Sequence, residues 1–339
     1  MSEPLYSPAK LWESSGGQAV RCRLCAQYCR IAKGESGKCG VRKNRGGELF
    51  TRSADEVAAV NLDPVEKKPL YHFLPGTSTF SVGSFGCNFS CSFCQNSDIS
   101  QYDPRWEGGG HAANPAGLVR SAQKYRAASI SYTYNEPTMF FELMRPTAAL
   151  AHAEGLYNVM VSNAYFSAEA FAELDGLIDA ANFDLKSFSD AFYQEYCGAR
   201  LKPVLQTVGR AVKAGWWVEL TTLLIPGLND GKDELAELAS YIVNELGQDV
   251  PWHVSRFHPA YRMTERQPTP VESLERALEA GSKAGLRYVY AGNLPGHEAE
   301  STFCPSCKCR LVGRRGYNTN SGFLGICPDC NFEVAGFWK

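Results

Sequence analysis

Three cysteines, Cys87, Cys91 and Cys94, lie close together at the spacing C-x3-C-x2-C. They directly follow an apolar run, Thr79 to Phe85, that is typical of a buried strand. Three thiolates from one short loop can hold three irons of a 4Fe–4S cluster. Electron-transfer clusters close the last position with a fourth cysteine, but no other cysteine lies between residues 48 and 103. The spacing therefore predicts an open iron that binds an outside ligand. The alternatives are a three-cysteine zinc site, which normally needs a fourth ligand, and reduced core thiols.

The residues around these cysteines fit a cluster. Gly83 and Gly86 allow the backbone to pass close to it. Phe89 and Phe93 would keep water away, and Phe93 is also a candidate to contact a bound cofactor.

A strand–helix alternation begins at residue 79 and predicts an α/β fold with a parallel sheet. The strand-like runs are Thr79–Phe85, Ser129–Tyr134, Tyr157–Ser162, Asn182–Lys186, Trp217–Leu224, Trp252–Phe257 and Arg287–Ala291. One helix begins at Asn114-Pro115, a cap with proline at the first helical position. Further helical patterns cover residues 138–153, 168–180, 202–214, 232–245 and 271–284. Seven strands favour a full or partial β/α barrel, in which the chemistry lies at the strand C-termini.

Polar or turn-forming residues follow five of these strands. The sets are Asn135-Glu136-Pro137-Thr138, Asp184-Leu185-Lys186, Ile225 to Asp230, Phe257-His258-Pro259 and Ala291-Gly292-Asn293. Each set alone is as easily a helix cap or a surface charge, and Glu136 could simply cap the helix that opens at Pro137. Five sets at the ends of parallel strands would all face one cavity, so we expect Asn293 and the other polar members to contact a cofactor there.

The N-terminal segment carries four more cysteines, Cys22, Cys25, Cys29 and Cys39, at the spacing C-x2-C-x3-C-x9-C. The segment is rich in Gly, Lys and Arg and shows little periodicity. We therefore expect it to lack a hydrophobic core and to be organised by a metal centre. A second iron–sulfur cluster and a structural zinc both fit these ligands, and the spacing does not decide between them.

The C-terminal segment carries two C-P-x-C knuckles with 19 residues between the inner cysteines. This pattern predicts a rubredoxin-like ribbon whose structural zinc is bound by Cys304, Cys307, Cys327 and Cys330. Cys309 would be a spectator beside that site, and the isolated Cys197 a small core residue. The expected domains are thus residues 1–60, 61–300 and 301–339.

Length and composition describe an ordinary globular protein of 339 residues. No apolar run approaches the roughly 18 residues of a membrane span, and the start has no signal pattern. We expect a cytoplasmic protein whose cysteines bind metal. Lysine plus arginine outnumber aspartate plus glutamate by 9 to 4 in residues 1–50 and by 5 to 2 in residues 301–339. In residues 51–300 the acidic residues are in excess, with 30 of them against 20 basic ones. The basic ends either contact a polyanion such as nucleic acid or offset thiolate charge.

The cysteine spacing, with an aromatic residue before the last cysteine, resembles the signature of the radical S-adenosylmethionine (SAM) enzymes. Residues 60–295 are similar to activases of the pyruvate formate-lyase type. With both flanking cysteine sets, the whole chain resembles the radical SAM member of the AmmeMemoRadiSam system. The resemblance implies a partial β/α barrel in which the methionyl amine and carboxylate of SAM bind the open iron. One electron then cleaves the sulfonium, and a 5′-deoxyadenosyl radical abstracts hydrogen from a substrate.

The same resemblance assigns roles to single residues. Asn135-Glu136-Pro137 stands where the family has its methionine-amine motif, with Tyr134 and Asn135 in place of two glycines. The other implied SAM contacts, to its carboxylate, ribose and adenine, are Asp184, Lys186, Ile225, Asp230 and His258.

Two enzymatic hypotheses follow. In the first, AmmeMemoRadiSam partner proteins supply a small molecule, protein or RNA that the adenosyl radical modifies. In the second, the chain is a glycyl-radical enzyme activase, although a minimal activase needs only the barrel. Both would take electrons from a donor such as flavodoxin or ferredoxin. A third hypothesis, a metal-stabilised nucleic-acid-binding protein, explains the basic ends but leaves the open iron without a role.

Overall fold

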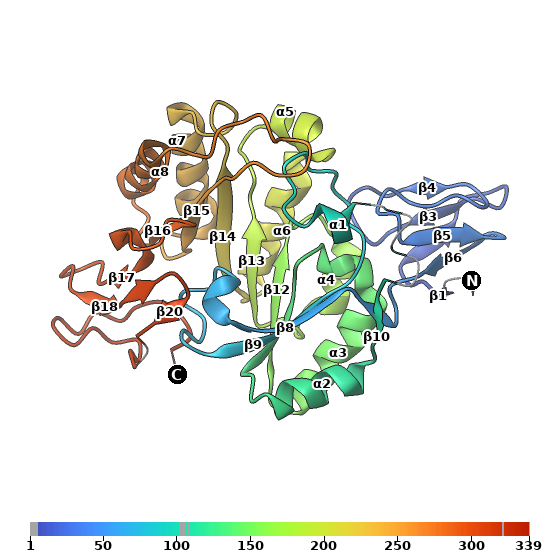
Figure 1. Ribbon diagram of the computed structural model, residues 1–339, viewed down its shortest axis with the longest axis horizontal. Coiled ribbons are helices and arrows are strands. Elements are labelled where there is room, and N and C mark those ends of the chain that lie inside the picture. The colour runs from blue at the N-terminus through green and yellow to red at the C-terminus, as the bar shows by residue number, and fades with distance from the viewer. Residues whose placement is uncertain (1–5, 102, 104–105, 107–108, 321, 339) are drawn as a thin grey trace.

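The computed structural model describes residues 6–101, 103, 106, 109–320 and 322–338, and its centre is one eight-stranded sheet (Figure 1). Seven strands run parallel in the spatial order β16-β15-β14-β13-β12-β11-β9. They are β9 (Ser78–Gly83), β11 (Ser129–Tyr132), β12 (Tyr157–Ser162), β13 (Ala180–Asp184), β14 (Trp217–Leu224), β15 (Trp252–Arg256) and β16 (Val289–Gly292). The predicted α/β fold with a parallel sheet is confirmed. The sequence did not predict β8 (Ala59–Pro64), which pairs antiparallel with β9.

The longer helices connect these strands. They are α2 (Pro115–Lys124), α3 (Phe141–Ala153), α4 (Ala168–Leu174), α6 (Leu201–Lys213), α7 (Lys232–Tyr241) and α8 (Val271–Ala284). Helix α2 begins as predicted, because the Asn114 side chain accepts a hydrogen bond from the Gly117 amide at 2.9 Å. Helix α4 ends earlier than predicted, just before Asp175 and a left-handed Gly176. No helix in the described part of the chain is long and apolar enough to cross a membrane.

Short helical elements complete the barrel region. They are α1 (Ser97–Ser100), α5 (Asp190–Phe192), the 3-10 helices η1 (Val65–Lys67), η3 (Pro137–Phe140) and η6 (Glu298–Glu300), and the π-helical turns η4 (Tyr193–Cys197) and η5 (Ile242–Leu246). Two small strands, β7 (Glu56–Val57) and β10 (His111–Ala112), pair with each other.

The sheet has one helix-covered face and one hollow face. Helices α2, α3, α6 and α8 contact the parallel strands. The residues that line the cavity on the other face alternate along the strands, as Thr221 and Leu223 do on β14 and His253 and Ser255 do on β15. Among the described strands, β8 and β16 form the two edges and do not pair with each other. The sheet is therefore open, as a partial barrel requires.

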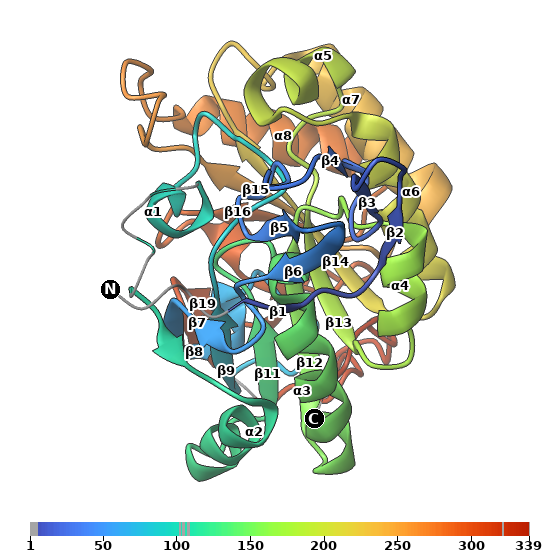
Figure 2. The ribbon, with the colours of Figure 1, turned by 90° about the vertical axis from the view of Figure 1, so that its right-hand side faces the viewer.

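Short antiparallel strands build the N-terminal segment, on the right of Figure 1 and nearest the viewer in Figure 2. They are β1 (Ser7–Pro8), β2 (Trp12–Ser14), β3 (Val20–Cys22), β4 (Arg30–Ile31), β5 (Arg42–Arg45) and β6 (Glu48–Thr51). Val20, Ile31 and Val41 are buried in the same core as the barrel. The expectation that this segment has no hydrophobic core is wrong, because its apolar side chains reach the main core.

The C-terminal segment packs against the opposite side of the barrel, on the left of Figure 1. Its strands are β17 (Thr302–Phe303), β18 (Arg310–Val312), β19 (Arg314–Arg315) and β20 (Asn318–Thr319). The Phe337 amide donates to the His72 carbonyl at 2.7 Å, and Leu74 donates to the Phe337 carbonyl at 2.8 Å. Val334 joins a small core with Tyr71 and two tyrosines of the barrel. The segment is therefore a docked module and not a free tail.

Candidate active site

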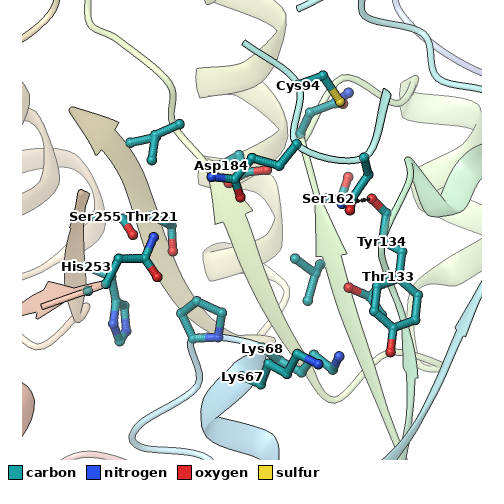
Figure 3. A pocket seen from close by; sticks show the side chains of 18 of the residues that line it. Lys67, Lys68, Cys94, Thr133, Tyr134, Ser162, Asp184, Thr221, His253 and Ser255 are labelled. Carbon is teal, nitrogen blue, oxygen red and sulfur yellow. Dashed lines mark hydrogen bonds between the residues drawn. The ribbon is translucent and has the colours of Figure 1, made fainter. Parts of the chain in front are cut away.

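The cluster-type loop after β9 and the carboxyl ends of β11 to β16 surround a cavity of about 620 Å³ (Figure 3). Active sites of parallel β/α barrels lie at this end of the strands. Cys94 lies at one end of the view, and Lys67 and Lys68 lie at the other. Tyr317 of the C-terminal module also lines the cavity. The cavity therefore extends from the cysteine loop to the docked module.

Two glycines fix the path of the cysteine loop. A Cβ on Gly83 would lie 2.7 Å from the Thr133 carbonyl oxygen, and one on Gly86 would lie 2.7 Å from that of Cys39. Gly86 also has a φ of +89°, which favours glycine. The sequence predicted that the two glycines let the backbone pass close to the cluster, but the close contacts observed are with neighbouring backbone. These contacts place the cysteine loop between β11 and the N-terminal segment.

The three predicted cluster cysteines all line the cavity. Burial raises the pKa of the Cys87 and Cys94 thiols, while a hydrogen bond with Cys197 lowers the pKa of Cys91. Cys197 is fully buried, as predicted, but it stands beside Cys91. Among the described residues, no fourth cysteine lines the cavity. The donor set thus fits three irons of a 4Fe–4S cluster and leaves the fourth position to a ligand in the cavity.

Two aromatic side chains shield the loop, as predicted. Phe89 and Phe93 are each 3% exposed and line the cavity. Phe89 packs edge-on against Tyr165 with ring centroids 5.1 Å apart, and Phe93 packs against Phe192 at 5.8 Å. These rings fix one wall of the site in an apolar environment.

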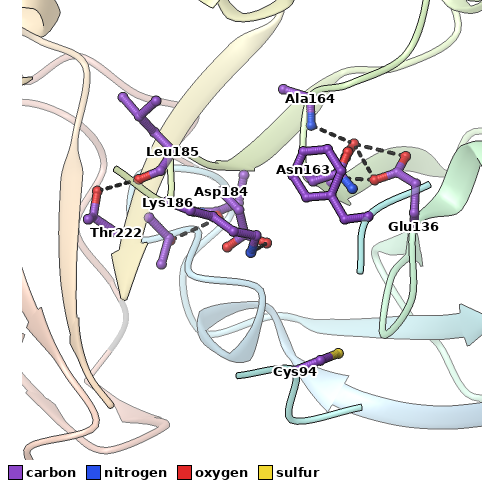
Figure 4. A network of polar contacts seen from close by, with 12 residues as sticks. Cys94, Glu136, Asn163, Ala164, Asp184, Leu185, Lys186 and Thr222 are labelled. Atoms are coloured by element: carbon purple, nitrogen blue, oxygen red, sulfur yellow. Dashed lines mark hydrogen bonds and ion pairs between the residues drawn. The ribbon is translucent and has the colours of Figure 1, made fainter. Parts of the chain in front are cut away.

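Glu136 lies at the end of β11, is 2% exposed, and lines the cavity. Its Oε1 accepts from the amide and hydroxyl of Thr138 at 3.2 and 2.7 Å. Its Oε2 accepts from the amide of Asn163 at 3.0 Å, and both residues are labelled in Figure 4. The Ser162 hydroxyl lies 3.0 and 2.9 Å from the two oxygens. Burial raises the pKa of Glu136 against the opposing effect of these donors. Glu136 therefore caps η3, the alternative role, and four donors occupy the roughly four acceptor positions of its carboxylate.

Tyr134 and Asn135 hold the end of β11 against the cysteine loop. The Asn135 side chain accepts from the Ser84 amide at 3.1 Å and donates to the Gly86 carbonyl at 2.8 Å. Tyr134 has a φ of +72°, a conformation that normally favours glycine. The backbone therefore follows a glycine-like path at this position although a tyrosine occupies it.

Asp184 and Lys186 form an ion pair on the cavity wall, with Oδ2 and Nζ 3.1 Å apart. The Lys186 ammonium also lies 5.9 Å from the centre of the Phe93 ring. Burial alone would lower the pKa of Lys186, but Asp184 and the Cys91 thiol together raise it above its ordinary value. Lys186 therefore stays charged beside the cysteine loop.

Of the remaining residues predicted to contact the cofactor, one lines the cavity and three do not. Asn293 lines the cavity, with its amide donating to the Arg256 carbonyl at 3.1 Å. The residues that line the cavity do not include Ile225, Asp230 or His258. Ile225 is fully buried, and His258 is exposed. The Asp230 side chain instead accepts from the Gly227 amide at 2.7 Å and from Ser273 at 2.8 Å, which fixes its turn to α8.

The four predicted zinc ligands of the tail lie together. All four Sγ atoms are within 4.8 Å of one another, with Cys304 and Cys330 3.5 Å apart and Cys307 and Cys327 3.6 Å apart. Cys309 is nearer than a spectator would be, at 3.4 Å from both Cys307 and Cys327. The tail cysteines therefore fit a metal site.

The four N-terminal cysteines line a second, smaller cavity between their own segment and the cysteine loop. They share it with Arg42 and Asn88. Arg42 is 1% exposed, forms an ion pair with Glu142, and directs its Nη1 to the Cys22 sulfur at 3.6 Å. The thiols of the N-terminal segment therefore lie next to Asn88 of the cysteine loop.

Sequence reasoning missed two polar residues of the site. Ser162 and Asn163 follow β12, bind Glu136, and line the cavity. The Asn163 amide also lies 3.7 Å from the Cys87 sulfur. The rule that polar residues at strand ends face one cavity would have found both, had it been applied to the third strand.

Comparison with known proteins identifies the superfamily. Residues 81–239 match the Radical SAM superfamily. This part of the chain is therefore a Radical SAM domain. It includes the end of β9, the cysteine loop and β11 to β14. A Radical SAM domain indicates an enzyme that uses a 4Fe–4S cluster and SAM, and it supports SAM cleavage.

The similarity to one relative extends over nearly the whole chain. The uncharacterized protein MJ0808 of Methanocaldococcus jannaschii is 43% identical over 330 residues, which cover 96% of this chain and 98% of that protein. A radical SAM methyltransferase from Sphaerobacter thermophilus aligns with a TM-score of 0.51 at 14% identity, covering 84% of this chain and 76% of that one. SuiB of Streptococcus suis bound to its precursor peptide SuiA also aligns with a TM-score of 0.51, at 13% identity over 68% and 52% of the two chains. The two structural likenesses concern the fold alone.

Proposed function

We propose that this chain is a radical SAM enzyme of the AmmeMemoRadiSam type whose catalytic cluster is held by Cys87, Cys91 and Cys94. The cluster and SAM together would supply a 5′-deoxyadenosyl radical for hydrogen abstraction. The observation that carries the proposal is the three-thiol set on the wall of a 620 Å³ cavity, where the described residues provide no fourth thiol.

The residues of the chain would bind and orient SAM in this cavity. Its methionyl end carries an ammonium and a carboxylate, and the Asp184–Lys186 pair offers both signs of charge within 3.1 Å. Lys186 would face the carboxylate and Asp184 the ribose, while Phe93 excludes water. Because Glu136 already holds four donors of the chain, the SAM amine would share its carboxylate with them. Glu136 would therefore act mainly by positioning Asn163 and the end of β12.

The C-terminal module supports a separately supplied substrate over an activase function. Its residues Gly316 and Tyr317 line the cavity. A glycyl-radical activase must admit a backbone segment of another enzyme, and the docked module narrows that approach. Lys67 and Lys68 both pair with Asp63, at 2.9 and 2.7 Å, so its carboxylate offsets one of their two positive charges. These three residues together leave a small positive excess at the cavity.

Part of the positive charge of the two basic ends is used in contacts within the protein. Arg23 pairs with Glu169 at 2.6 Å, and the buried Arg42 pairs with Glu142. The buried Arg314 donates to the Tyr71 carbonyl at 2.7 Å. The buried Arg42 and Arg314 join the ends to the barrel and are not presented to a polyanion, whereas the Arg23 side chain is 41% exposed.

The tail would bind a structural zinc. Its four thiols are close enough for one tetrahedral ion and leave no open coordination position. Cys309 could replace a neighbouring ligand, since it lies 3.4 Å from two of them.

Formation of 5′-deoxyadenosine tests the proposed function. Anaerobically reconstituted protein with dithionite should convert SAM to 5′-deoxyadenosine and methionine, and Cys91→Ala should abolish the conversion. Cys309→Ser is the matched control, because Cys309 lies outside the cavity of the active site. Cleavage at the wild-type rate in the Cys91 variant would exclude the assigned cluster.

A further inference from the structure

The N-terminal cysteines are arranged differently from those of the tail, although both sets contain four thiols. In the described part of the chain, every group of three or more Cys, His, Asp or Glu ligand atoms within 4.8 Å of one another belongs to the tail. No three thiols of the N-terminal set come that close. Tetrahedral zinc, with Zn–S bonds of about 2.3 Å, needs sulfurs roughly 3.8 Å apart. The N-terminal set is therefore too wide for a single zinc ion.

These four thiols nevertheless face one enclosed space. All of them line the same small cavity, whose walls also include the apolar Leu24, Ile31 and Met139. Four thiolates around one enclosed and largely apolar cavity are the ligand set of a 4Fe–4S cluster.

The surrounding polar groups also suit a cluster. The Arg42 guanidinium is buried and donates to the Cys22 sulfur at 3.6 Å. Its Nε is buried without a hydrogen-bond partner among the described residues. A cation and a hydrogen bond at a cluster thiolate offset its negative charge and tune its reduction potential.

The N-terminal cavity adjoins the loop of the catalytic cysteines. Gln27 donates to the Asn88 carbonyl at 2.8 Å, and Gly86 is in tight contact with the Cys39 carbonyl. Asn88 lines the N-terminal cavity, and its side-chain oxygen lies 3.9 Å from the Cys87 sulfur. A single residue thus lies between the two thiol sets.

We propose that Cys22, Cys25, Cys29 and Cys39 bind a second 4Fe–4S cluster that supplies the electron for the active site. A one-electron donor protein of the flavodoxin or ferredoxin class would be oxidised as this cluster is reduced. The same electron then passes by way of Asn88 to the catalytic centre, where SAM cleavage consumes it. The electron-transfer role rests on the proposed function, whereas the presence of the cluster does not.

Iron and zinc counting on the full chain tests the cluster. Wild-type protein should hold about eight irons and one zinc. The Cys87→Ala/Cys91→Ala/Cys94→Ala variant should keep about four irons with an EPR signal after dithionite reduction. Cys25→Ser/Cys39→Ser should also keep about four irons, and Cys309→Ser should keep all eight. A catalytic triple variant without iron and with a second zinc would overturn the proposal, whether or not the wild type cleaves SAM.

The source of the electron is tested with two reductants. With a reduced flavodoxin as donor, Cys25→Ser/Cys39→Ser should form 5′-deoxyadenosine at least tenfold more slowly than the wild type. With dithionite, which is small enough to reach the active-site cavity, its rate should stay within about twofold. Equal rates with flavodoxin would overturn the electron-transfer role. Stopped-flow oxidation of the reduced flavodoxin by Cys25→Ser/Cys39→Ser, measured without SAM, should be slower than with the wild type by the same factor. If the wild type forms no 5′-deoxyadenosine with either reductant, the proposed function itself is overturned.

Discussion

Each end of the chain carries a set of four cysteines predicted to bind metal, but the two sets are arranged differently. In the tail, the four sulfurs lie within 4.8 Å of one another. Each knuckle closes with a left-handed residue, Lys308 at φ +66° and Asn331 at φ +59°. The amides of these residues donate to the first cysteine carbonyl of their knuckle, Cys304 or Cys327, at 3.0 Å. The N-terminal thiols are spread around a cavity that also touches the barrel. Thiol spacing and surroundings, and not the number of cysteines, thus separate the two sites.

The difference matches the place of each site in the molecule. The tail site lies in a module docked on the side of the barrel opposite the N-terminal segment (Figure 1), and for this site we propose a closed structural metal. The N-terminal site lies against the loop of Cys87 through Gly86 and Asn88. A redox centre can act only where it has such a neighbour. The comparison predicts that changes at the two ends have separable effects on zinc, iron and catalysis.

The largest effect is expected from removing the tail metal. Cys304→Ser/Cys327→Ser should lose the zinc, whose binding to a structural site contributes apparent free energies on the order of 10 kcal/mol to folding. Trypsin, which cleaves after lysine and arginine, should then cut inside the module at Lys308 and Arg310. Metal analysis of the same sample should find the iron content unchanged. Loss of iron together with zinc would show that the two ends are not independent.

Acid should weaken the docking of the tail module without affecting the N-terminal site. His72 joins module and barrel, with its ring nitrogens 2.7 Å from the Ala335 carbonyl and 2.6 Å from the Tyr290 hydroxyl. Burial lowers the pKa of His72 from 6.5 to about 4. The stabilisation is therefore complete above pH 6.5 and is lost toward pH 4, by about 1.4 kcal/mol per unit.

Thermal unfolding at pH 7.0 and 5.0 measures this loss. His72→Gln should flatten the pH dependence, and zinc content at each pH controls for protonation of the metal ligands. A wild-type melting temperature that does not fall at pH 5.0 would contradict the assigned role of His72.

A smaller effect is expected at Glu136, between the two ends. Glu136→Gln should weaken SAM binding by roughly 1–3 kcal/mol and also lower the melting temperature, because the carboxylate both faces the cavity and caps η3. Thr138→Val is the matched control, since it removes only the hydroxyl bond to Glu136 and should lower stability alone. If Glu136→Gln and Thr138→Val bind SAM with equal affinity, Glu136 only caps η3 and does not bind SAM.

The sequence predicted the seven parallel strands because long buried strands and capped helices carry clear periodic signals. It missed β8 and the N-terminal strands, which are short or polar and are held by their partners. The rule that polar residues at strand ends face one cavity predicted Asp184 and Asn293, and both line the cavity. The same rule could not place Asp230, whose side chain turns toward Ser273 of α8. Nor could the chain order show that Cys197 lies beside Cys91, since that contact depends on the folded η4 turn.

The response of each cluster to SAM tests the central claim most directly, because only the three-cysteine centre should have an open iron. EPR spectra of dithionite-reduced Cys25→Ser/Cys39→Ser protein, which keeps the catalytic centre alone, should change when SAM is added. The spectrum of the Cys87→Ala/Cys91→Ala/Cys94→Ala variant, which keeps the four-cysteine centre, should stay the same. A SAM-induced change in the triple variant, or none in the double variant, would contradict the assignment of SAM binding to Cys87, Cys91 and Cys94.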